Sequence, residues 1–136
     1  MKKTNRQNSS IKFYCTSIFD FNYQPNSYDF IYDCGLFHHL APHRRLHFIE
    51  LIKSALKDDG YLGIVCFNED GASTISDREV YREQSLKGGI GYSEERFKSV
   101  FMKDFTIITY RKMKRMTDIN GLFGEDFLSV SLMKKA

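Results

Sequence analysis

Two short apolar segments, separated by a stretch of helical periodicity, constrain the fold of this 136-residue chain most strongly. YDFIYDC (28–34) and YLGIVCF (61–67) are rich in aromatic and β-branched residues and hold few charges, as strands buried on both faces do. Between them, apolar residues recur at helical spacing from Pro42 to Leu56. A strand, a crossover helix and a strand form a right-handed βαβ unit, so the sequence predicts an α/β fold with a mainly parallel sheet.

The remaining chain divides into further strands and capped helices. Gly60 follows the helical stretch and is expected to end it in a left-handed conformation. Ser76 and Glu79 are spaced as a capping box, and Ser93 suits another helix start. The other expected elements are a strand at 11–19, a turn at 22–27, helices at 76–88 and 93–101, and a closing antiparallel hairpin of strands at 104–113 and 126–135.

Length and composition fit one domain at 11–136, preceded by a polar segment at 1–10 that is predicted to be disordered or extended. No apolar run approaches the roughly 18 residues of a membrane span, and no secretory signal is present. The single cysteines, without CxxC spacing, favour a cytoplasmic protein with reduced thiols. The net charge of +3 is dispersed, which disfavours a nucleic-acid partner.

In this order of elements, the chain resembles the C-terminal half of a small bacterial class I (Rossmann-like) S-adenosylmethionine-dependent methyltransferase. IKFYCTSIFDF resembles the family's third strand and adenine-holding turn, and YDFIYDCGLFHHL resembles its fourth strand and the loop lining the methyl-transfer pocket. LKDDGYLGIVCF resembles the turn and fifth strand, and SDREVYREQSLKGGIGYSEERFKSVF a substrate-side insertion with the next helix. The resemblance implies S-adenosylmethionine as cofactor and a small-molecule methyl acceptor.

The resemblance also implies a cofactor pocket at strand ends. Ser17 falls where the family often has an acid that accepts from the adenine amino group, and Ile18 offers its backbone amide to the ring. Asp33, Cys34 and Gly35 end the fourth strand, where ligands bind in open α/β sheets. Gly35 lets the backbone approach the sulfonium. Asp33 either faces the sulfonium or takes an acceptor proton; the alternative is a cap on the following turn.

Further polar residues are candidates for catalysis and acceptor binding. Either His38 or His39 is a candidate base for a hydroxyl or amine acceptor, the alternative being that the rings pack under the loop and fix a carbonyl. Tyr81, Arg82 and Tyr92 lie in or beside the insertion that covers the acceptor in such enzymes, and Arg82 could pair with an anionic substrate. The alternative is that the insertion is a polar-faced surface helix.

Three histidines at four-residue spacing, His39, His43 and His47, raise the possibility of zinc. Pro42 is expected to start the helix after His39, so the three do not share one helical face. No carboxylate or thiol nearby in the sequence completes the ligand set. The expectation is therefore that the chain holds no metal.

One part of the family pattern is missing. The family holds the amino-acid end of its cofactor with a glycine-rich loop after the first strand, whereas the glycine-dense run of this chain, GGIG (88–91), comes late and follows no buried strand. The chain is interpreted as a truncated product, a C-terminal half or one part of a split enzyme that binds S-adenosylmethionine weakly or not at all alone. A non-catalytic remnant that dimerises or binds a partner is the alternative. An RNA-binding module is disfavoured by the apolar strands.

The first and second strands of the family fold, which separate its third strand from its fourth, also have no counterpart in this sequence, and this bears on assembly. Without them, one edge of the strand at 28–34 lacks its native neighbour, and an apolar unpaired edge is a template for pairing. Either the segment at 11–19 folds against it as a hairpin or a second copy supplies the neighbour. Self-association is expected in either case.

Overall fold

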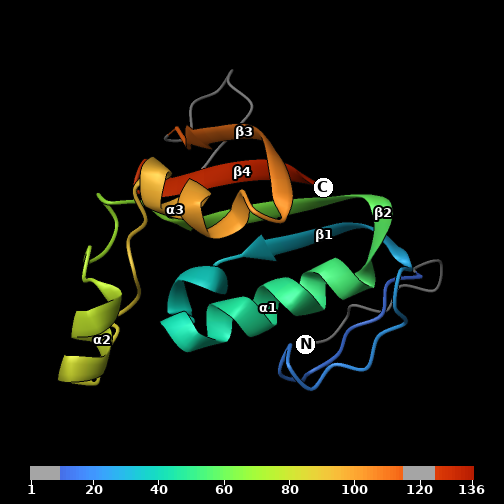
Figure 1. Ribbon diagram of the computed structural model, residues 1–136, viewed down its shortest axis with the longest axis horizontal. Coiled ribbons are helices and arrows are strands. Elements are labelled where there is room, and N and C mark those ends of the chain that lie inside the picture. The colour runs from blue at the N-terminus through green and yellow to red at the C-terminus, as the bar shows by residue number, and fades with distance from the viewer. Residues whose placement is uncertain (1–9, 115–124) are drawn as a thin grey trace.

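A computed structural model describes residues 10–114 and 125–136 (Figure 1). The prediction of disorder at 1–10 lies, apart from Ser10, outside these residues, as does the loop around Gly121 and Gly124. The helices and strands are β1 (Tyr28–Cys34), the short 3₁₀ helix η1 (Phe37–His39), α1 (Pro42–Ala55), β2 (Leu56–Phe67), α2 (Asp77–Glu83), α3 (Glu94–Phe101), β3 (Phe105–Lys112) and β4 (Leu128–Lys135).

The four strands form one sheet in the order β1–β2–β4–β3. β1 and β2 are parallel, with Ile31 opposite Leu62, and α1 makes the crossover between them. β4 inserts between β2 and β3 and is antiparallel to both. The predicted α/β class, βαβ unit and antiparallel closing pair are confirmed. Among the described strands the sheet is mixed rather than mainly parallel, because β4 reverses direction next to β2.

The end of α1 differs from the prediction. The helix ends at Ala55 and the chain enters β2 at once, and Gly60 is not among the glycines with positive φ, so its predicted role as a left-handed helix stop is wrong. The Lys135 ammonium instead donates to the carbonyl oxygens of Lys53 (2.7 Å) and Leu56 (2.9 Å), which satisfies acceptors at the helix end. Gly60 is required by space, since a Cβ there would lie 2.8 Å from the Leu56 side chain.

The strand predicted at 11–19 does not form. A strand needs a hydrogen-bonding neighbour, and within the described residues the outer edge of β1 pairs with no strand. The hairpin, one of the two arrangements raised from the sequence, therefore does not form, and pairing with a second copy stays a prediction. The segment instead packs on α1 through Phe19. The Arg44 guanidinium lies 3.9 Å from the centre of the Phe19 ring, and the His47 ring lies 4.9 Å from it.

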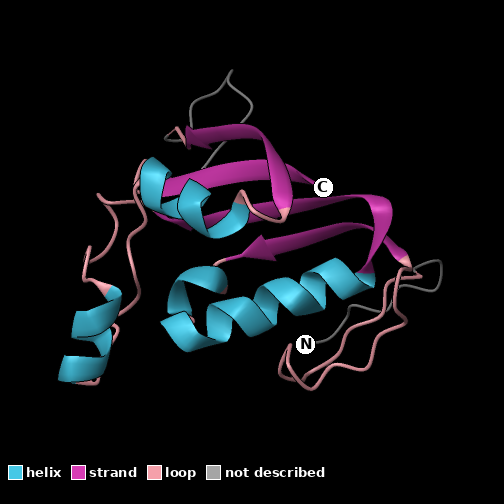
Figure 2. Cartoon of the chain, in the orientation of Figure 1, coloured by secondary structure: helices cyan, strands magenta, loops and turns pink. Residues whose placement is uncertain are grey.

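The core lies between one face of the sheet and the helices α1 and α3 (Figure 2). Alternation along β2 directs Leu62 and Ile64 into it, while Gly63 points to the opposite face. On that opposite face Phe30 and Tyr32 stack with their ring centres 6.3 Å apart and remain about half exposed. Phe30 and Tyr32 thus leave a large part of their aromatic surface exposed.

Candidate functional site

A groove of about 470 Å³ lies at the carboxyl end of β1, between the N-terminal segment and the loop that leaves the strand. The Ser17 carbonyl accepts from the Asp20 amide (3.0 Å), and the Ser17 hydroxyl accepts from the Phe19 amide (3.2 Å). This tight turn places Ser17 and Ile18 opposite Leu36, although they are distant in sequence. The lining residues are Tyr14, Thr16, Ser17, Ile18, Phe19, Phe21 and Leu36.

The loop after β1 is shaped by Asp33, which is buried. One carboxylate oxygen accepts from the Leu36 amide (2.8 Å) and the other from the Phe37 amide (2.9 Å). Burial raises the pKa of Asp33, and the two amide hydrogen bonds act against that rise. Both oxygens are therefore engaged in capping η1, the alternative raised from the sequence. Gly35 adopts φ +94, where a side chain would be strained, and its amide donates to the Val65 carbonyl (3.0 Å).

His38 joins this loop to the end of β2. Its ring is 3% exposed and stacks on Phe67 with ring centres 3.9 Å apart. The Phe67 amide donates to Nδ1 of His38 (2.9 Å), so the ring carries its proton on Nε2. Burial, with a smaller contribution from His39, lowers the pKa of His38 to about 4. The lone pair of Nδ1, the only one that the neutral ring has for accepting a proton, is engaged by the Phe67 amide, so His38 is not placed to take a proton from an acceptor. The contacts of His38 fit the alternative raised from the sequence, in which the ring packs under the loop.

His39 is placed differently. Its ring is exposed and meets that of His38 edge-on, with centres 4.4 Å apart. It lies beside Gly89, where a Cβ would be 3.4 Å from the His39 ring. Phe67 ends β2 nearby, with ring centres 6.2 Å apart. Of the two candidate bases, His39 is the one that faces open space at the strand ends.

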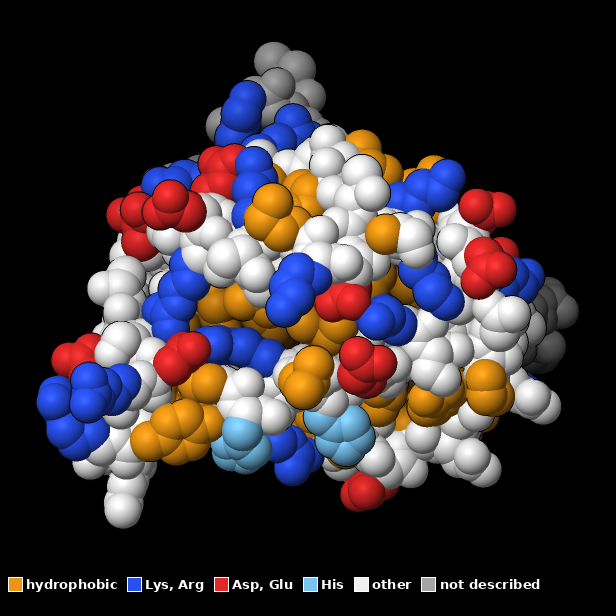
Figure 3. All heavy atoms as spheres, viewed as in Figure 1, with side chains coloured by type: hydrophobic (Ala, Val, Ile, Leu, Met, Phe, Trp, Pro, Cys, Tyr) orange, Lys and Arg blue, Asp and Glu red, His pale blue; other side chains and the backbone are white. Residues whose placement is uncertain are grey.

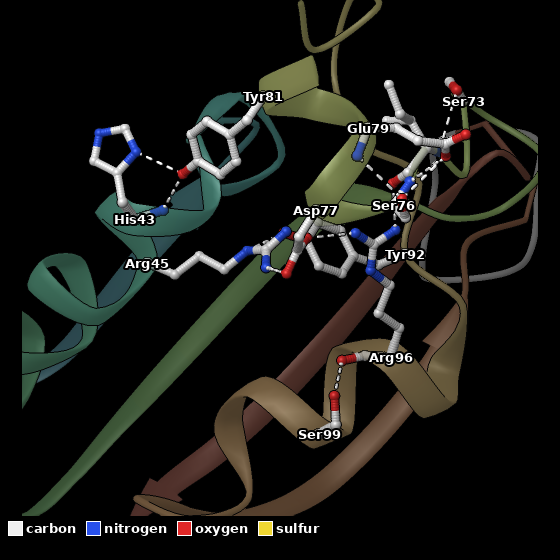
Figure 4. Close-up of polar contacts among 11 residues, drawn as sticks. His43, Arg45, Ser73, Ser76, Asp77, Glu79, Tyr81, Tyr92, Arg96 and Ser99 are labelled. Carbon is white, nitrogen blue, oxygen red and sulfur yellow. Dashed lines mark hydrogen bonds and ion pairs between the residues drawn. The ribbon is translucent and has the colours of Figure 1, made fainter. Parts of the chain in front are cut away.

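The insertion containing α2 makes polar contacts with the start of α1 (Figure 4). The Tyr81 hydroxyl accepts from the His43 amide (2.8 Å) and lies 2.6 Å from Nδ1 of the same residue. Arg82 is exposed and pairs with Glu79 at 3.5 Å. Tyr92 is fully buried in the core, so its predicted contact with an acceptor is wrong. The predicted capping box of Ser76 and Glu79 is confirmed.

The structure also shows a cluster that sequence reasoning missed. Arg45, Asp77 and Arg96 come from α1, α2 and α3, and Asp77 bridges the two guanidiniums at 2.8 Å each. Each guanidinium carbon lies 5.2 Å from the centre of the Tyr92 ring. Although burial opposes its charge, the two arginines lower the pKa of Asp77. In the sequence these residues resemble ordinary helix-surface charges; only the cap at Ser76 marks where Asp77 begins its helix.

Within residues 10–114 and 125–136, no three His, Cys, Asp or Glu side chains are grouped so that they could hold a metal ion. None of the helices there combines the length and the apolar character that crossing a membrane requires. On the face shown in Figure 3, Lys and Arg alternate with Asp and Glu, unlike the one-sign surface typical of nucleic-acid binding.

Comparison with known proteins gives a consistent result. Residues 1–64 match the family model described as "Methyltransferase domain". A SAM-dependent methyltransferase from Methanosarcina mazei superposes with a TM-score of 0.61 at 15% identity, over 88% of this chain and 65% of that one. The 1,6-didemethyltoxoflavin-N1-methyltransferase of Burkholderia thailandensis gives 0.63 at 17%, over 88% and 48%. The N-methyltransferase NodS of Bradyrhizobium japonicum gives 0.61 at 14%, over 95% and 56%.

The superpositions cover most of this chain but a smaller share of the structures it matches. This chain spans less than two thirds of each of these three structures. At such low identity, the superpositions show the fold. No curated protein matches the sequence. The sheet order, the strand-end groove and the family match thus agree on one fold.

Proposed function

We propose that this chain belongs to the class I S-adenosylmethionine-dependent methyltransferase family and takes part in methyl transfer to a small-molecule acceptor, which the match of residues 1–64 and the likeness in fold support. The observation that carries the proposal is the groove at the carboxyl end of β1, where ligands bind in open α/β sheets. Two of the structural neighbours were solved with S-adenosylhomocysteine, the demethylated cofactor, and one of these also with 1,6-didemethyltoxoflavin. They support this cofactor and a small acceptor.

The residues of the groove suit the adenine end of the cofactor. Phe19 and Leu36 offer apolar surface for the flat ring, and the Ser17 hydroxyl can accept from an exocyclic amine. The Ile18 amide lies in the same turn and is assigned to the ring edge. A hydroxyl is a weaker acceptor than a carboxylate, so we expect a weaker contact than an acid would give.

The loop after β1 then faces the reacting end. S-adenosylmethionine supplies an electrophilic methyl group, and orientation and exclusion of water dominate such a displacement. Asp33 holds the loop, and His38 fixes η1 by its stack on Phe67. Cys34 and Gly35, which precede Leu36 in this loop, are assigned to the cofactor side. His39 is assigned as the base that receives the acceptor proton. Tyr81 and Arg82 remain candidates for the acceptor side, because both are exposed on α2.

The rest of the cofactor site is assigned to another segment or polypeptide, because the sequence lacks a glycine-rich loop after a first buried strand. The exposed edge of β1 is where it would attach: an apolar pocket of about 230 Å³ beside Phe30 and Ile31 adjoins it. The same edge favours a second candidate function, a non-catalytic module that pairs with a second copy or a partner. The three free cysteines support a cytoplasmic setting.

The test is ligand-observed NMR with adenosine, S-adenosylhomocysteine and methionine, each at millimolar concentration. If this chain holds only the adenine side, adenosine and S-adenosylhomocysteine bind and compete, whereas methionine gives no signal. Leu36→Glu, in the groove, should abolish binding, while Leu46→Glu, exposed on α1 outside the groove, should not. Binding of methionine, or no competition between the two nucleosides, contradicts the assignment.

Calorimetric titration with S-adenosylmethionine tests whether the chain lacks the glycine-rich loop that holds the methionine end of the cofactor. The isolated chain should bind S-adenosylmethionine more weakly than micromolar, since the methionine end has no partner in the sequence. A dissociation constant of micromolar or below for a monomer would show that the chain holds a complete cofactor site.

A further inference from the structure

Three charged side chains from three helices meet beside the carboxyl end of β2. Arg45 Nη1 donates to one oxygen of Asp77 and Arg96 Nη2 donates to the other, both at 2.8 Å. The cluster lies around the ring of Tyr92. The backbone amide of Tyr92 donates to the carbonyl of Phe67, the last residue of β2. Two positive charges face one carboxylate, so the cluster carries an uncompensated positive charge (Figure 4).

The Arg45 guanidinium is not fully satisfied. Arg45 is 9% exposed, its Nε donates to the Tyr92 hydroxyl (2.7 Å), and its Nη2 is buried without a hydrogen-bond partner. Buried polar atoms normally find a partner, and a guanidinium is shaped to bind two oxygens of one anion side by side. Arg96, by contrast, also donates from Nη1 to the Ile75 carbonyl (2.9 Å). The site thus presents a buried donor that Asp77 does not reach.

Asp77 is the least firmly held member. Its side chain is 51% exposed, against 11% for Arg45 and 24% for Arg96. It begins α2, a seven-residue helix in which only Val80 is buried and which stands apart from the sheet (Figure 1). The chain after α2 passes through four residues with positive φ before α3: Gln84, Lys87, Gly88 and Gly89. Loop residues of this kind can absorb a change in helix position.

We propose that Arg45 and Arg96 form a binding site for a small oxyanion, the carboxylate or phosphate of a ligand, and that Asp77 occupies this site in the free protein. The ligand replaces the Asp77 carboxylate, gains the unpaired Nη2 donor of Arg45, and releases the start of α2. Arginine is suited to such planar two-oxygen recognition. The inference stands on these contacts and holds whether or not the chain transfers methyl groups.

The experiment titrates inorganic phosphate, and separately acetate, into the folded chain at constant ionic strength set with chloride. Arginine side-chain and backbone amide NMR signals report binding. Wild type should bind weakly, with shifts at Arg45 and Asp77. Asp77→Asn should bind about tenfold more tightly. When the Asp77 carboxylate fills the site about nine-tenths of the time in wild type, only about one-tenth of the wild-type sites are open to the anion, and the apparent affinity falls about tenfold. Arg45→Gln should lose binding.

The matched control is Arg111→Gln, which makes the same change of charge at an exposed arginine on β3 and should bind as wild type does. Binding of phosphate alone would assign the site to phosphate-bearing ligands, and binding of both anions to oxyanions in general. The proposal is overturned if Asp77→Asn binds no more tightly than wild type, or if Arg45→Gln retains binding. Should Asp77→Asn not fold, shifts in wild type confined to surface lysines would overturn it equally.

Discussion

Acidification should destabilise the protein chiefly through His38. The pKa of this histidine is lowered to about 4, first by burial and then by His39, whereas an unfolded histidine titrates near 6.5. Because the folded value lies below the unfolded one, the unfolded chain takes up the proton first as the pH falls. The contribution is therefore zero above about pH 6.5, and stability is lost progressively from there to about pH 4.

The size of the effect follows from the gap between the two pKa values. About two and a half units at 1.36 kcal/mol per unit give a loss of about 3 kcal/mol. A small domain is stable by only about 5–15 kcal/mol, so this single group removes a large share. Burial also raises the pKa of Asp33, so a contribution of this carboxyl group to the pH dependence must be controlled for.

The assay is urea unfolding between pH 7 and pH 4 for wild type and His38→Asn. Asparagine does not titrate, and its side-chain oxygen can accept from the Phe67 amide near the position of Nδ1. Asp33 contributes equally to both proteins, so the difference between their pH slopes isolates His38. Wild type should lose about 3 kcal/mol more than the variant. His39→Asn is the matched control: it removes only the smaller of the two causes that lower the pKa of His38, so it should keep most of the wild-type slope. Equal slopes for wild type and His38→Asn would refute the reasoning.

Three further outcomes are expected. Asp33→Asn weakens the caps on the Leu36 and Phe37 amides and should cost about 1–3 kcal/mol in urea unfolding; no measurable loss would mean that the carboxylate is free for chemistry. Ser76→Ala removes the capping box and should cost about 1 kcal/mol, seen as lower hydrogen-exchange protection of α2, and unchanged protection would contradict it. Lysine at both exposed β1 aromatics, Phe30 and Tyr32, should reduce self-association in light scattering, whereas Met102→Lys on another surface should not; a wild type that stays monomeric at all dilutions would defeat the idea.

The sequence predicts those helices and strands that are determined by residues close together along the chain. The strand at 28–34 has the bounds of β1, and the caps at Ser76 and Ser93 start α2 and α3, because apolar runs and capping side chains act within a few residues. The segment at 11–19 has the composition of a strand, yet a strand depends on a neighbour that composition does not report. Gly60 likewise has the position of a helix stop, but Lys135, from the far end of the chain, donates to the carbonyl oxygens at that helix end.

In the candidate site, too, some features follow from the sequence and others depend on tertiary packing. The strand-end position of Asp33 and Gly35 is predictable from the order of elements, because parallel strands end at one edge of the sheet. The burial of Tyr92 and the partners of Arg45 are not, since they depend on how α1, α2 and α3 pack together. Which of two adjacent histidines is buried is also a tertiary property: His38 stacks on Phe67, and His39 is exposed.

The most direct test of the central claim is to map S-adenosylhomocysteine onto the ¹⁵N-labelled chain by backbone amide shifts at millimolar ligand. The largest shifts should fall on Ser17, Ile18 and Leu36, around the groove at the carboxyl end of β1, with smaller ones at Gly35. No shifts at this concentration, or shifts centred on the Arg45 cluster instead, would contradict the assignment of the groove to the adenine end of the cofactor.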